Sequence, residues 1–414
     1  MEMRPGTCRP ATRWWILCRV IDNFGDAGVC WRLARQLATE HHAEVTLFID
    51  RPERLAGLAG GDGALTAGGP TAGSVSVAPW PDSPVDPHIA PPQILLSAFG
   101  CEPPAWIRAL LAGGPRQPLW INLEYLSAES WVDGCHGLAS IKPDGAVEHF
   151  FYPGFTPATG GLLRERDAVA DAVSGNHGTD ALRSARLTQL CSQEPLAGER
   201  VLTLFCYPGP AVDALLAALA DGERPTLLLV PAGVAPGQIE AFAGRPLQAG
   251  DPAVERGRLR IARIPFLSQS GYDDLLRLAD LNFVRGEDSW VRAHWARRPF
   301  IWQPYRQEQG SHHDKLEAFL DRLTATAALI DPEACVALAT MMRAWSGYGG
   351  GEAGSADPGV GPAWQALARH ELQLGALFRP WIDSLLGQAD LALQLAAFAE
   401  RKLQQAIMPG SPHQ

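Results

Sequence analysis

Two aspartates stand in a short glycine-containing loop near the start of the chain. An apolar run, W-W-I-L-C-R-V-I, occupies residues 14–21, and the loop D-N-F-G-D-A-G that follows carries Asp22 and Asp26. The junction between a buried strand and a helix N-terminus is where α/β proteins place chemistry, and glycines let a substrate approach the backbone closely. The alternative is that Asp22 or Asp26 simply caps the following helix. The loop lacks the G-x-G-x-x-G spacing of dinucleotide-binding proteins.

A second acidic segment lies in the other half of the chain. The apolar run L-N-F-V leads into R-G-E-D-S-W-V-R-A at 285–293, which places Glu287, Asp288 and Ser289 at a predicted helix N-terminus. Backbone N–H groups and a serine hydroxyl at such a position suit a phosphate. The acidic pair fits a phosphate poorly, unless a carboxylate accepts hydrogen bonds from sugar hydroxyls. Alternatively, Asp288 or Ser289 is an N-cap.

Two aromatic segments end other predicted strands of the same half. F-C-Y contains Phe205 and Tyr207, and P-F-L-S-Q contains Phe266 and Gln269. Aromatic residues there are either core residues or a platform for a base. Because both segments and the second acidic segment follow strands of one sheet, we expect them to converge on one pocket.

The pattern of apolar runs predicts two α/β halves, which we place at 14–165 and 200–379. Strands are predicted at 14–21, 45–50, 93–97, 119–123, 201–206, 226–230, 259–265, 281–284 and 300–303, with helices between several of them. A polar segment, 166–199, is the predicted linker and contains a weak helix at 180–190. One long amphipathic helix at 380–408 is expected to complete the first half.

Glycine-rich stretches interrupt this pattern. Residues 56–92 are rich in Gly, Ala and Pro and are predicted to be a mobile loop, and 346–362 is predicted to be a further surface loop.

Composition narrows the class of protein. The chain has 414 residues, a net charge of −10 and a pI near 5.6, without a long Lys/Arg run, so no nucleic-acid partner is expected. No apolar stretch is long enough to span a membrane and no signal-peptide pattern is present, so we expect a cytoplasmic protein. The eight cysteines include no C-x-x-C pair, which favours reduced thiols over a zinc site.

Several segments together resemble one family, the elongation factor P maturation arginine rhamnosyltransferases (EarP). The similarity spans residues 15–406 and is strongest in two long motifs, C-R-V-I-D-N-F-G-D-A-G-V-C-W-R-L-A-R-Q-L at 18–37 and F-V-R-G-E-D-S-W-V-R-A-H-W-A-R-R-P-F-I-W-Q at 283–303. W-I-N-L-E-Y-L-S-A-E-S-W-V at 120–132 and H-H-D-K-L-E-A-F-L at 312–320 also fit. Departures are an extension at 1–13, insertions at 56–80 and 346–362, and Arg306 where proline is expected.

The resemblance implies a GT-B fold, in which two Rossmann-like domains face each other across a cleft. It implies inverting transfer of L-rhamnose from dTDP-β-L-rhamnose to an arginine at the loop tip of the first domain of elongation factor P, which then rescues ribosomes stalled on proline runs. The donor would bind the C-terminal half and the acceptor the N-terminal half. Neither a metal nor another cofactor would be needed, and the absence of a D-x-D motif agrees.

Carried over residue by residue, the resemblance gives each candidate a role. Asp26 would be the general base, and Asp22 would orient the acceptor guanidinium or support the loop. The donor site would be formed by seven residues. These are Tyr207, Asp288 and Ser289 for the diphosphate, Phe205, Phe266 and Gln269 for thymine and nucleoside, and Glu287. Glu287 would also be catalytic, and it would hold the donor either through the ribose or through groups that neutralise the pyrophosphate.

Two alternatives come from different classes. The first is a GT-B glycosyltransferase with a small-molecule or lipid acceptor, which the shape and charge of the N-terminal half should decide. The second is a non-catalytic module that binds a nucleotide sugar or the translation factor. Retention of Asp22, Asp26, Glu287 and Asp288 argues against such a module.

Overall fold

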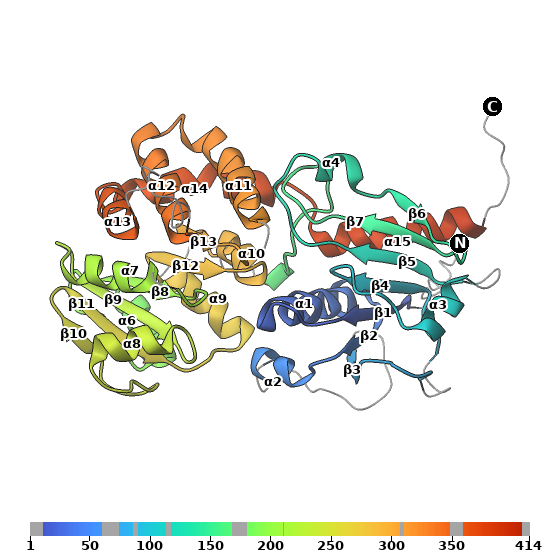
Figure 1. The fold of residues 1–414 in the computed structure, drawn as a ribbon, viewed down its shortest axis with the longest axis horizontal. Coiled ribbons are helices and arrows are strands. Elements are labelled where there is room, and N and C mark those ends of the chain that lie inside the picture. Colours follow the sequence, from blue (N-terminus) through green and yellow to red (C-terminus); the bar gives the residue numbers. More distant parts are fainter. Residues whose placement is uncertain are drawn as a thin grey trace, which may run out of the picture.

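The protein consists of two α/β lobes, each built on its own sheet (Figure 1). The computed structural model describes residues 11–59, 74–85, 90–112, 117–167, 180–209, 211–306, 310–347 and 359–407. The first lobe contains the N-terminal sheet, and the second lobe contains the C-terminal sheet.

The first lobe is organised by a seven-stranded sheet with the order β3-β2-β1-β4-β5-β7-β6. In chain order its strands are β1 (Arg13–Cys18), β2 (Glu44–Ile49), β3 (Val75–Pro79), β4 (Ile94–Ala98), β5 (Leu119–Leu123), β6 (Ala139–Ile141) and β7 (Val147–Phe151). All neighbours are parallel except β6, which runs antiparallel to β7 at the edge. The central strands are nearly continuous in apolar residues because helices cover both faces of a parallel sheet.

The second lobe repeats this plan with six strands in the order β10-β11-β9-β8-β12-β13. They are β8 (Arg200–Leu204), β9 (Thr226–Pro231), β10 (Val254–Arg256), β11 (Leu259–Ile264), β12 (Leu281–Arg285) and β13 (Phe300–Gln303). Its edge strand β10 is antiparallel to β11, and the other pairs are parallel. In both sheets the chain therefore starts in the middle, winds to one side, and then returns to the other side of the first strand. This is the Rossmann order, whose reversal point opens a crevice at the carboxyl ends of the strands.

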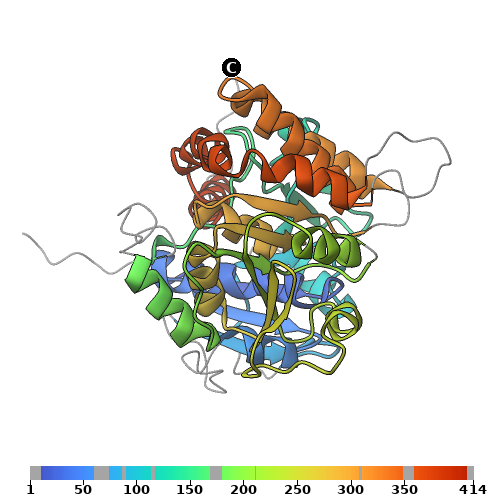
Figure 2. The same ribbon diagram turned by 90° about the vertical axis from the view of Figure 1, so that its left-hand side faces the viewer.

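Helices cover the sheets and connect their strands. The first lobe contains α1 (Asn23–His41), α2 (Glu53–Ala59), α3 (Ala105–Ala112) and α4 (Val132–Cys135). The second contains α6 (Asp180–Cys191), α7 (Ala211–Ala220), α8 (Pro236–Ala243), α9 (Gln269–Leu278), α10 (Asp288–Trp295), α11 (Ser311–Ala327), α12 (Pro332–Trp345), α13 (Val360–Ala368) and α14 (Glu371–Leu386). In Figure 2 the orange and red helices α11–α14 lie above the C-terminal sheet.

The end of the chain crosses back to the first lobe. The prediction of one long helix at 380–408 is wrong, because two helices occupy this region: α14 packs against α11 and α12, and α15 (Leu391–Ile407) packs against α1 and β5 (Figure 1). The break falls at Gly387 to Asp390, where the Asp390 carboxylate accepts the Leu393 N–H at 3.0 Å and so caps α15. Of this segment, α15 is the part that packs on the first lobe.

The predicted loop at 56–92 and the predicted linker both contain regular secondary structure that belongs to a lobe. Within the predicted loop 56–92, α2 extends to Ala59 and β3 pairs in parallel with β2, while residues 60–73 and 86–89 lie outside the described residues. The short pattern V-S-V-A-P is obscured by the surrounding glycines and alanines. Most of the predicted loop 346–362 also lies outside the described residues. The predicted linker contains α6, which packs on α9 and thus belongs to the second lobe.

None of the helices in the described part of the chain is both long enough and apolar enough to cross a membrane.

Candidate active site

The loop between β1 and α1 is held by a carboxylate that folds back on its own backbone. Asp26 is 2% exposed, and its Oδ2 accepts the N–H groups of Ile21 at 2.7 Å and Asp22 at 2.8 Å. The helix already begins at Asn23, and Asp22 at the N-cap position makes no side-chain cap bond. The capping alternative is therefore wrong for both aspartates.

Asp22 reaches across the cleft to the second lobe. Its Oδ2 accepts the Tyr207 hydroxyl at 2.7 Å, which joins the end of β1 to the end of β8. Gly286 leaves room for this pair. It has a φ of +60°, and a Cβ there would lie 2.7 Å from Asp22 Oδ2 and 2.8 Å from the Tyr207 oxygen. Any larger residue at 286 would be strained and would collide with the pair.

The Ser289 side chain closes the turn between β12 and α10 by bonding to the backbone of that turn. The Ser289 hydroxyl accepts the Arg285 N–H at 3.0 Å and donates to the Arg285 carbonyl. The N-cap position of α10 is taken by Glu287, which makes no side-chain cap bond. The N-cap alternative for Asp288 and Ser289 is therefore wrong. Any contribution of Ser289 to anion binding must come from its backbone N–H, since the first N–H groups of a helix lack intrahelical partners.

The Asp288 carboxylate is also occupied by protein groups. Its Oδ1 accepts Arg32 Nη1 at 2.8 Å, and its Oδ2 accepts Arg292 Nε at 3.0 Å and contacts Gln269 Nε2 at 3.5 Å. The Asp288 carboxylate thus holds two arginine side chains and one glutamine amide in place around the start of α10.

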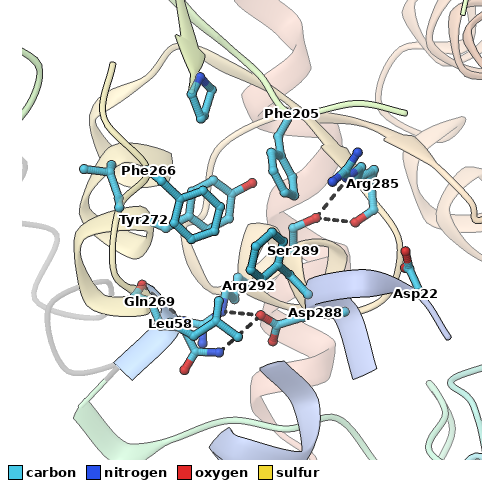
Figure 3. Close-up of a pocket in the computed structure, with 14 residues that line it drawn as sticks. Asp22, Leu58, Phe205, Phe266, Gln269, Tyr272, Arg285, Asp288, Ser289 and Arg292 are labelled. Atoms are coloured by element: carbon cyan, nitrogen blue, oxygen red, sulfur yellow. Dashed lines mark hydrogen bonds and ion pairs between the residues drawn. The ribbon is translucent and has the colours of Figure 1, made fainter. Parts of the chain in front are cut away.

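The residues expected to bind the sugar donor converge, with further aromatic residues, on one cavity between the lobes, which we call the aromatic cavity (Figure 3). Its empty volume, counted together with the space that opens to solvent, is about 670 Å³. The lining residues are Asp22, Phe24, Gly25, Leu58, Phe205, Pro231, Phe266, Leu267, Gln269, Tyr272, Arg285, Asp288, Ser289 and Arg292. Six of the predicted site residues are among them, which confirms the expected convergence of the strand-end segments.

The walls of the aromatic cavity differ in chemistry. Figure 3 shows the rings of Phe205, Phe266 and Tyr272 along one side and the polar groups of Asp288 and Arg292 on the other. The first lobe contributes Phe24, whose ring centroid lies 4.8 Å from that of Phe266. A flat apolar group could therefore insert beside the aromatic rings while an anionic group meets the arginine side.

Sequence reasoning did not predict the other eight lining residues, and three of these, Tyr272, Arg285 and Arg292, have polar side chains. The Arg285 guanidinium lies 4.4 Å from the Phe205 ring centroid and 4.7 Å from that of Tyr207, and its Nη1 donates to the Cys206 carbonyl at 2.7 Å. Arg285 opens the second acidic motif, so its position at the end of β12 was a usable signal. Arg292 lies in the same motif, one turn after Asp288, whereas nothing in the sequence placed Tyr272 at the cavity.

A second cavity adjoins the first, and we call it the acidic cavity. Its lining residues are Ile21, Asp22, Gly25, Asp26, Tyr125, Leu126, Gly286, Glu287, Trp290, Trp302, Pro304, Tyr305 and Lys315. It contains three carboxylates from both lobes. Glu287 lies here, where its Oε2 accepts the Leu126 N–H of the first lobe at 3.0 Å. Asp22 and Gly25 line both cavities, so the two spaces meet at the end of β1.

Burial alters the protonation of the acidic cavity. It raises the pKa of Glu287 to about 8, against the smaller opposing effects of the Leu126 N–H and of Lys315. Burial also raises the pKa of Asp26, an effect that the N–H groups of Asp22 and Ile21 partly offset. The pKa of Asp22 is raised by burial as well, against the Tyr207 hydroxyl and the Arg285 charge. Three carboxylates, of which Asp26 is buried and Asp22 and Glu287 are partly buried, outnumber the cations here and form a site suited to a cationic group.

A metal ion has no evident set of ligands in this part of the molecule. Across the residues that the structure describes, no group of three or more His, Cys, Asp or Glu side chains is arranged to hold one.

Two Rossmann-like domains that face each other across such a cleft define a glycosyltransferase of the GT-B type. The comparison with known families agrees. The model described as "Elongation-Factor P (EF-P) rhamnosyltransferase EarP" matches residues 14–400, and the chain belongs to this family.

Individual relatives are similar over almost their whole length. The chain is 39% identical over 391 residues to a protein-arginine rhamnosyltransferase of Pseudomonas putida, covering 94% of this chain and 99% of the relative. It is 40% identical over 395 residues to the protein-arginine rhamnosyltransferase of Pseudomonas aeruginosa, covering 93% and 98%. Among solved structures, one described as the structural basis for EarP-mediated arginine glycosylation of translation elongation factor EF-P matches with a TM-score of 0.62 and 30% identity, covering 94% of this chain and 99% of that chain.

Proposed function

We propose that this protein transfers L-rhamnose from dTDP-β-L-rhamnose to an arginine side chain on the first domain of elongation factor P, with inversion at the anomeric carbon. The observation that carries the proposal is the continuity of the two cavities at Asp22. One cavity suits a nucleotide and the other suits a cation, as transfer to arginine requires. The reaction would take place in the cytoplasm, with neither a nucleic-acid partner nor membrane attachment.

The donor would occupy the aromatic cavity. Phe205, Phe266 and Gln269 would surround thymine and nucleoside, as the family resemblance implies. The diphosphate would lie at the start of α10, where the N–H groups of Asp288 and Ser289 and the positive end of the helix dipole favour an anion. The Tyr207 hydroxyl stands at the junction, where it could contact the diphosphate next to the reacting carbon. No metal would be needed, because helix and side-chain donors supply the charge stabilisation.

The acceptor guanidinium would enter the acidic cavity. A guanidinium offers donors in a rigid fork that matches carboxylates bidentately, and Asp22, Asp26 and Glu287 present carboxylates from two lobes. Glu287 would therefore serve the acceptor side of the reaction, which differs from the donor-holding role that the family resemblance implies.

Proton removal would fall to Asp26. An arginine nitrogen is a poor nucleophile while its guanidinium is protonated and delocalised. A carboxylate fixed by two backbone N–H groups, with a pKa raised by burial, is a stronger base than an exposed one. The nitrogen would attack the anomeric carbon as the bond to the diphosphate oxygen breaks. The proton would pass to Asp26, and dTDP would leave.

The decisive experiment is intact-mass spectrometry of elongation factor P from the same organism after incubation with the protein and dTDP-β-L-rhamnose. The expected result is a mass gain of one deoxyhexose residue on the loop arginine, with no gain on a factor in which that arginine is lysine. Donor binding by calorimetry without any mass gain would point to another acceptor. If dTDP-β-L-rhamnose does not bind and elongation factor P gains no mass, the proposal is overturned.

A further inference from the structure

Arg32 on α1 is a buried cation that the mechanism above does not use. Its side chain is 2% exposed. Nε and Nη2 donate to the two carboxylate oxygens of Glu165 at 2.6 and 2.5 Å, and Nη1 donates to Asp288 Oδ1 at 2.8 Å. All three guanidinium nitrogens are therefore bonded to carboxylates.

These partners belong to different parts of the molecule. Arg32 lies on the first helix of the first lobe, and Asp288 is the first residue of α10 in the second lobe. Glu165 lies beyond β7, in the segment that leaves the first lobe. The guanidinium thus joins the first lobe, its exit segment and the helix at whose start the donor phosphates are expected.

The two helices are in close contact around this bridge. Gly28, one turn before Arg32, has no room for a side chain, because a Cβ there would lie 2.9 Å from Asp288 Oδ2. Gln269 Nε2 also donates to the Gly28 carbonyl at 3.3 Å. On the side of α10, Arg292 bonds Asp288 at 3.0 Å and Asp273 at 2.7 Å.

The consequence for the reaction follows from what each helix carries. The N-terminal end of α1 holds the loop with Asp22 and Asp26, whereas the N-terminal end of α10 borders the aromatic cavity through Ser289. The placement of α1 on α10 therefore sets the distance between the proposed base and the leaving group. A shift of about 1 Å at such a distance can cost about a hundredfold in rate.

We propose that Arg32 is a positioning residue that fixes the acceptor loop of the first lobe relative to the donor helix α10, through its simultaneous bonds to Glu165 and Asp288. The inference rests on the proposed function for the identity of the reaction, but the bridge itself is a property of this chain. Arginine is required because a lysine ammonium cannot bond two carboxylates in this forked geometry.

The test compares full-length Arg32→Gln and Arg32→Lys with Arg35→Gln as matched control, since Arg35 lies one turn further along α1 and is exposed. Turnover with saturating donor and elongation factor P is expected to fall about a hundredfold for Arg32→Gln and about tenfold for Arg32→Lys, while the dissociation constant for dTDP alone changes less than about threefold. Arg35→Gln is expected to behave as wild type. A lost ion pair that merely lowered stability would not separate turnover from dTDP affinity in this way.

The double variant Arg32→Gln/Glu165→Gln covers the case in which Arg32→Gln does not fold, because it removes the cation and its principal anion together and leaves Asp288 paired with Arg292. It is expected to fold and to show the same loss of turnover. Small-angle X-ray scattering of each folded variant should report a more open arrangement of the lobes than in wild type.

The outcomes separate the two proposals. Turnover within about twofold of wild type in the folded Arg32 variants, or a loss that appears equally in dTDP affinity, overturns the positioning role and leaves the rhamnosyltransferase assignment intact. If wild type transfers no sugar, the proposed function fails. The scattering curves then decide the positioning role alone, and unchanged curves refute it.

Discussion

The two cavities that meet at Asp22 differ in the chemistry of the side chains that line them. The aromatic cavity is dominated by rings from the second lobe and has Arg285 and Arg292 as its cations. The acidic cavity contains three carboxylates, one of which, Glu287, has its pKa raised to about 8 by burial. Each environment suits one substrate, a flat base with an anionic diphosphate in the first and a cation in the second.

The two cavities also differ in which lobes contribute to them. The carboxylates of the acidic cavity are drawn from both lobes, so that site exists only when the lobes are in contact. The aromatic cavity is formed mainly by the second lobe, with Phe24 and Leu58 added from the first. We therefore expect substitutions at the two cavities to separate turnover from donor binding.

The largest expected effect is that of Asp26→Asn. An asparagine oxygen can still accept the N–H groups of Ile21 and Asp22, so the loop should keep its shape while the base is lost. Turnover should fall about a thousandfold, with dTDP affinity unchanged by calorimetry. Asp50→Asn is the control, because Asp50 also holds this loop through the Val20 N–H at 2.9 Å but lies outside both cavities. Wild-type turnover in Asp26→Asn would remove Asp26 from the role of base.

The next effect concerns Glu287 and pH. A protonated Glu287 cannot pair with a guanidinium, so kcat/KM should rise with pH up to about 8, the pKa to which burial raises this group. Glu287→Gln should lower kcat/KM for elongation factor P about tenfold to a hundredfold and remove this part of the pH dependence. Both would be measured by quantitative mass spectrometry of the product. A pH profile identical to wild type in the variant would contradict the assignment.

A smaller effect is expected at the junction of the cavities. Tyr207→Ala should weaken dTDP binding about tenfold, whereas Tyr207→Phe, which keeps the ring under Arg285 and loses the 2.7 Å bond to Asp22, should weaken it less. Calorimetry with dTDP measures both. Unchanged affinity in Tyr207→Ala would place the diphosphate elsewhere.

The raised pKa of Glu287 should also make the free energy of unfolding depend on pH. Between its ordinary value of 4.5 and its raised pKa of about 8, the folded protein holds a proton that the unfolded chain has released. The free energy of unfolding should therefore decrease as pH rises through this range. Glu287→Gln should show a weaker decrease in denaturant titrations at a series of pH values. Equal slopes in the two proteins would mean that Glu287 titrates normally.

The smallest expected effect is that of chelation. EDTA should leave transfer unchanged, because the start of α10 and the arginines of the aromatic cavity are proposed to supply the charge that a divalent ion provides elsewhere. Loss of activity with EDTA, restored by Mg²⁺, would contradict this part of the proposal.

The sequence by itself determined the two α/β halves and the strand-end segments that share one cavity. Apolar runs between helical patterns indicated two α/β halves, because buried parallel strands must be almost wholly apolar. Since those strands end at one edge of each sheet, Phe205, Phe266 and Gln269 could be expected in one pocket with Ser289, as the aromatic cavity confirms.

Tertiary structure alone decided how the polar side chains are used. Spacing could not show that Asp26 bonds the loop backbone, that Ser289 closes its own turn, or that Glu287 faces the acidic cavity, because each depends on a side-chain direction or on the other lobe. Arg32 lies within the motif at 18–37, but its bridging role could not be predicted, since its partners lie 133 and 256 residues away along the chain. Local sequence patterns specify helices and strands through nearest neighbours, whereas a buried ion bridge exists only after distant segments have packed together.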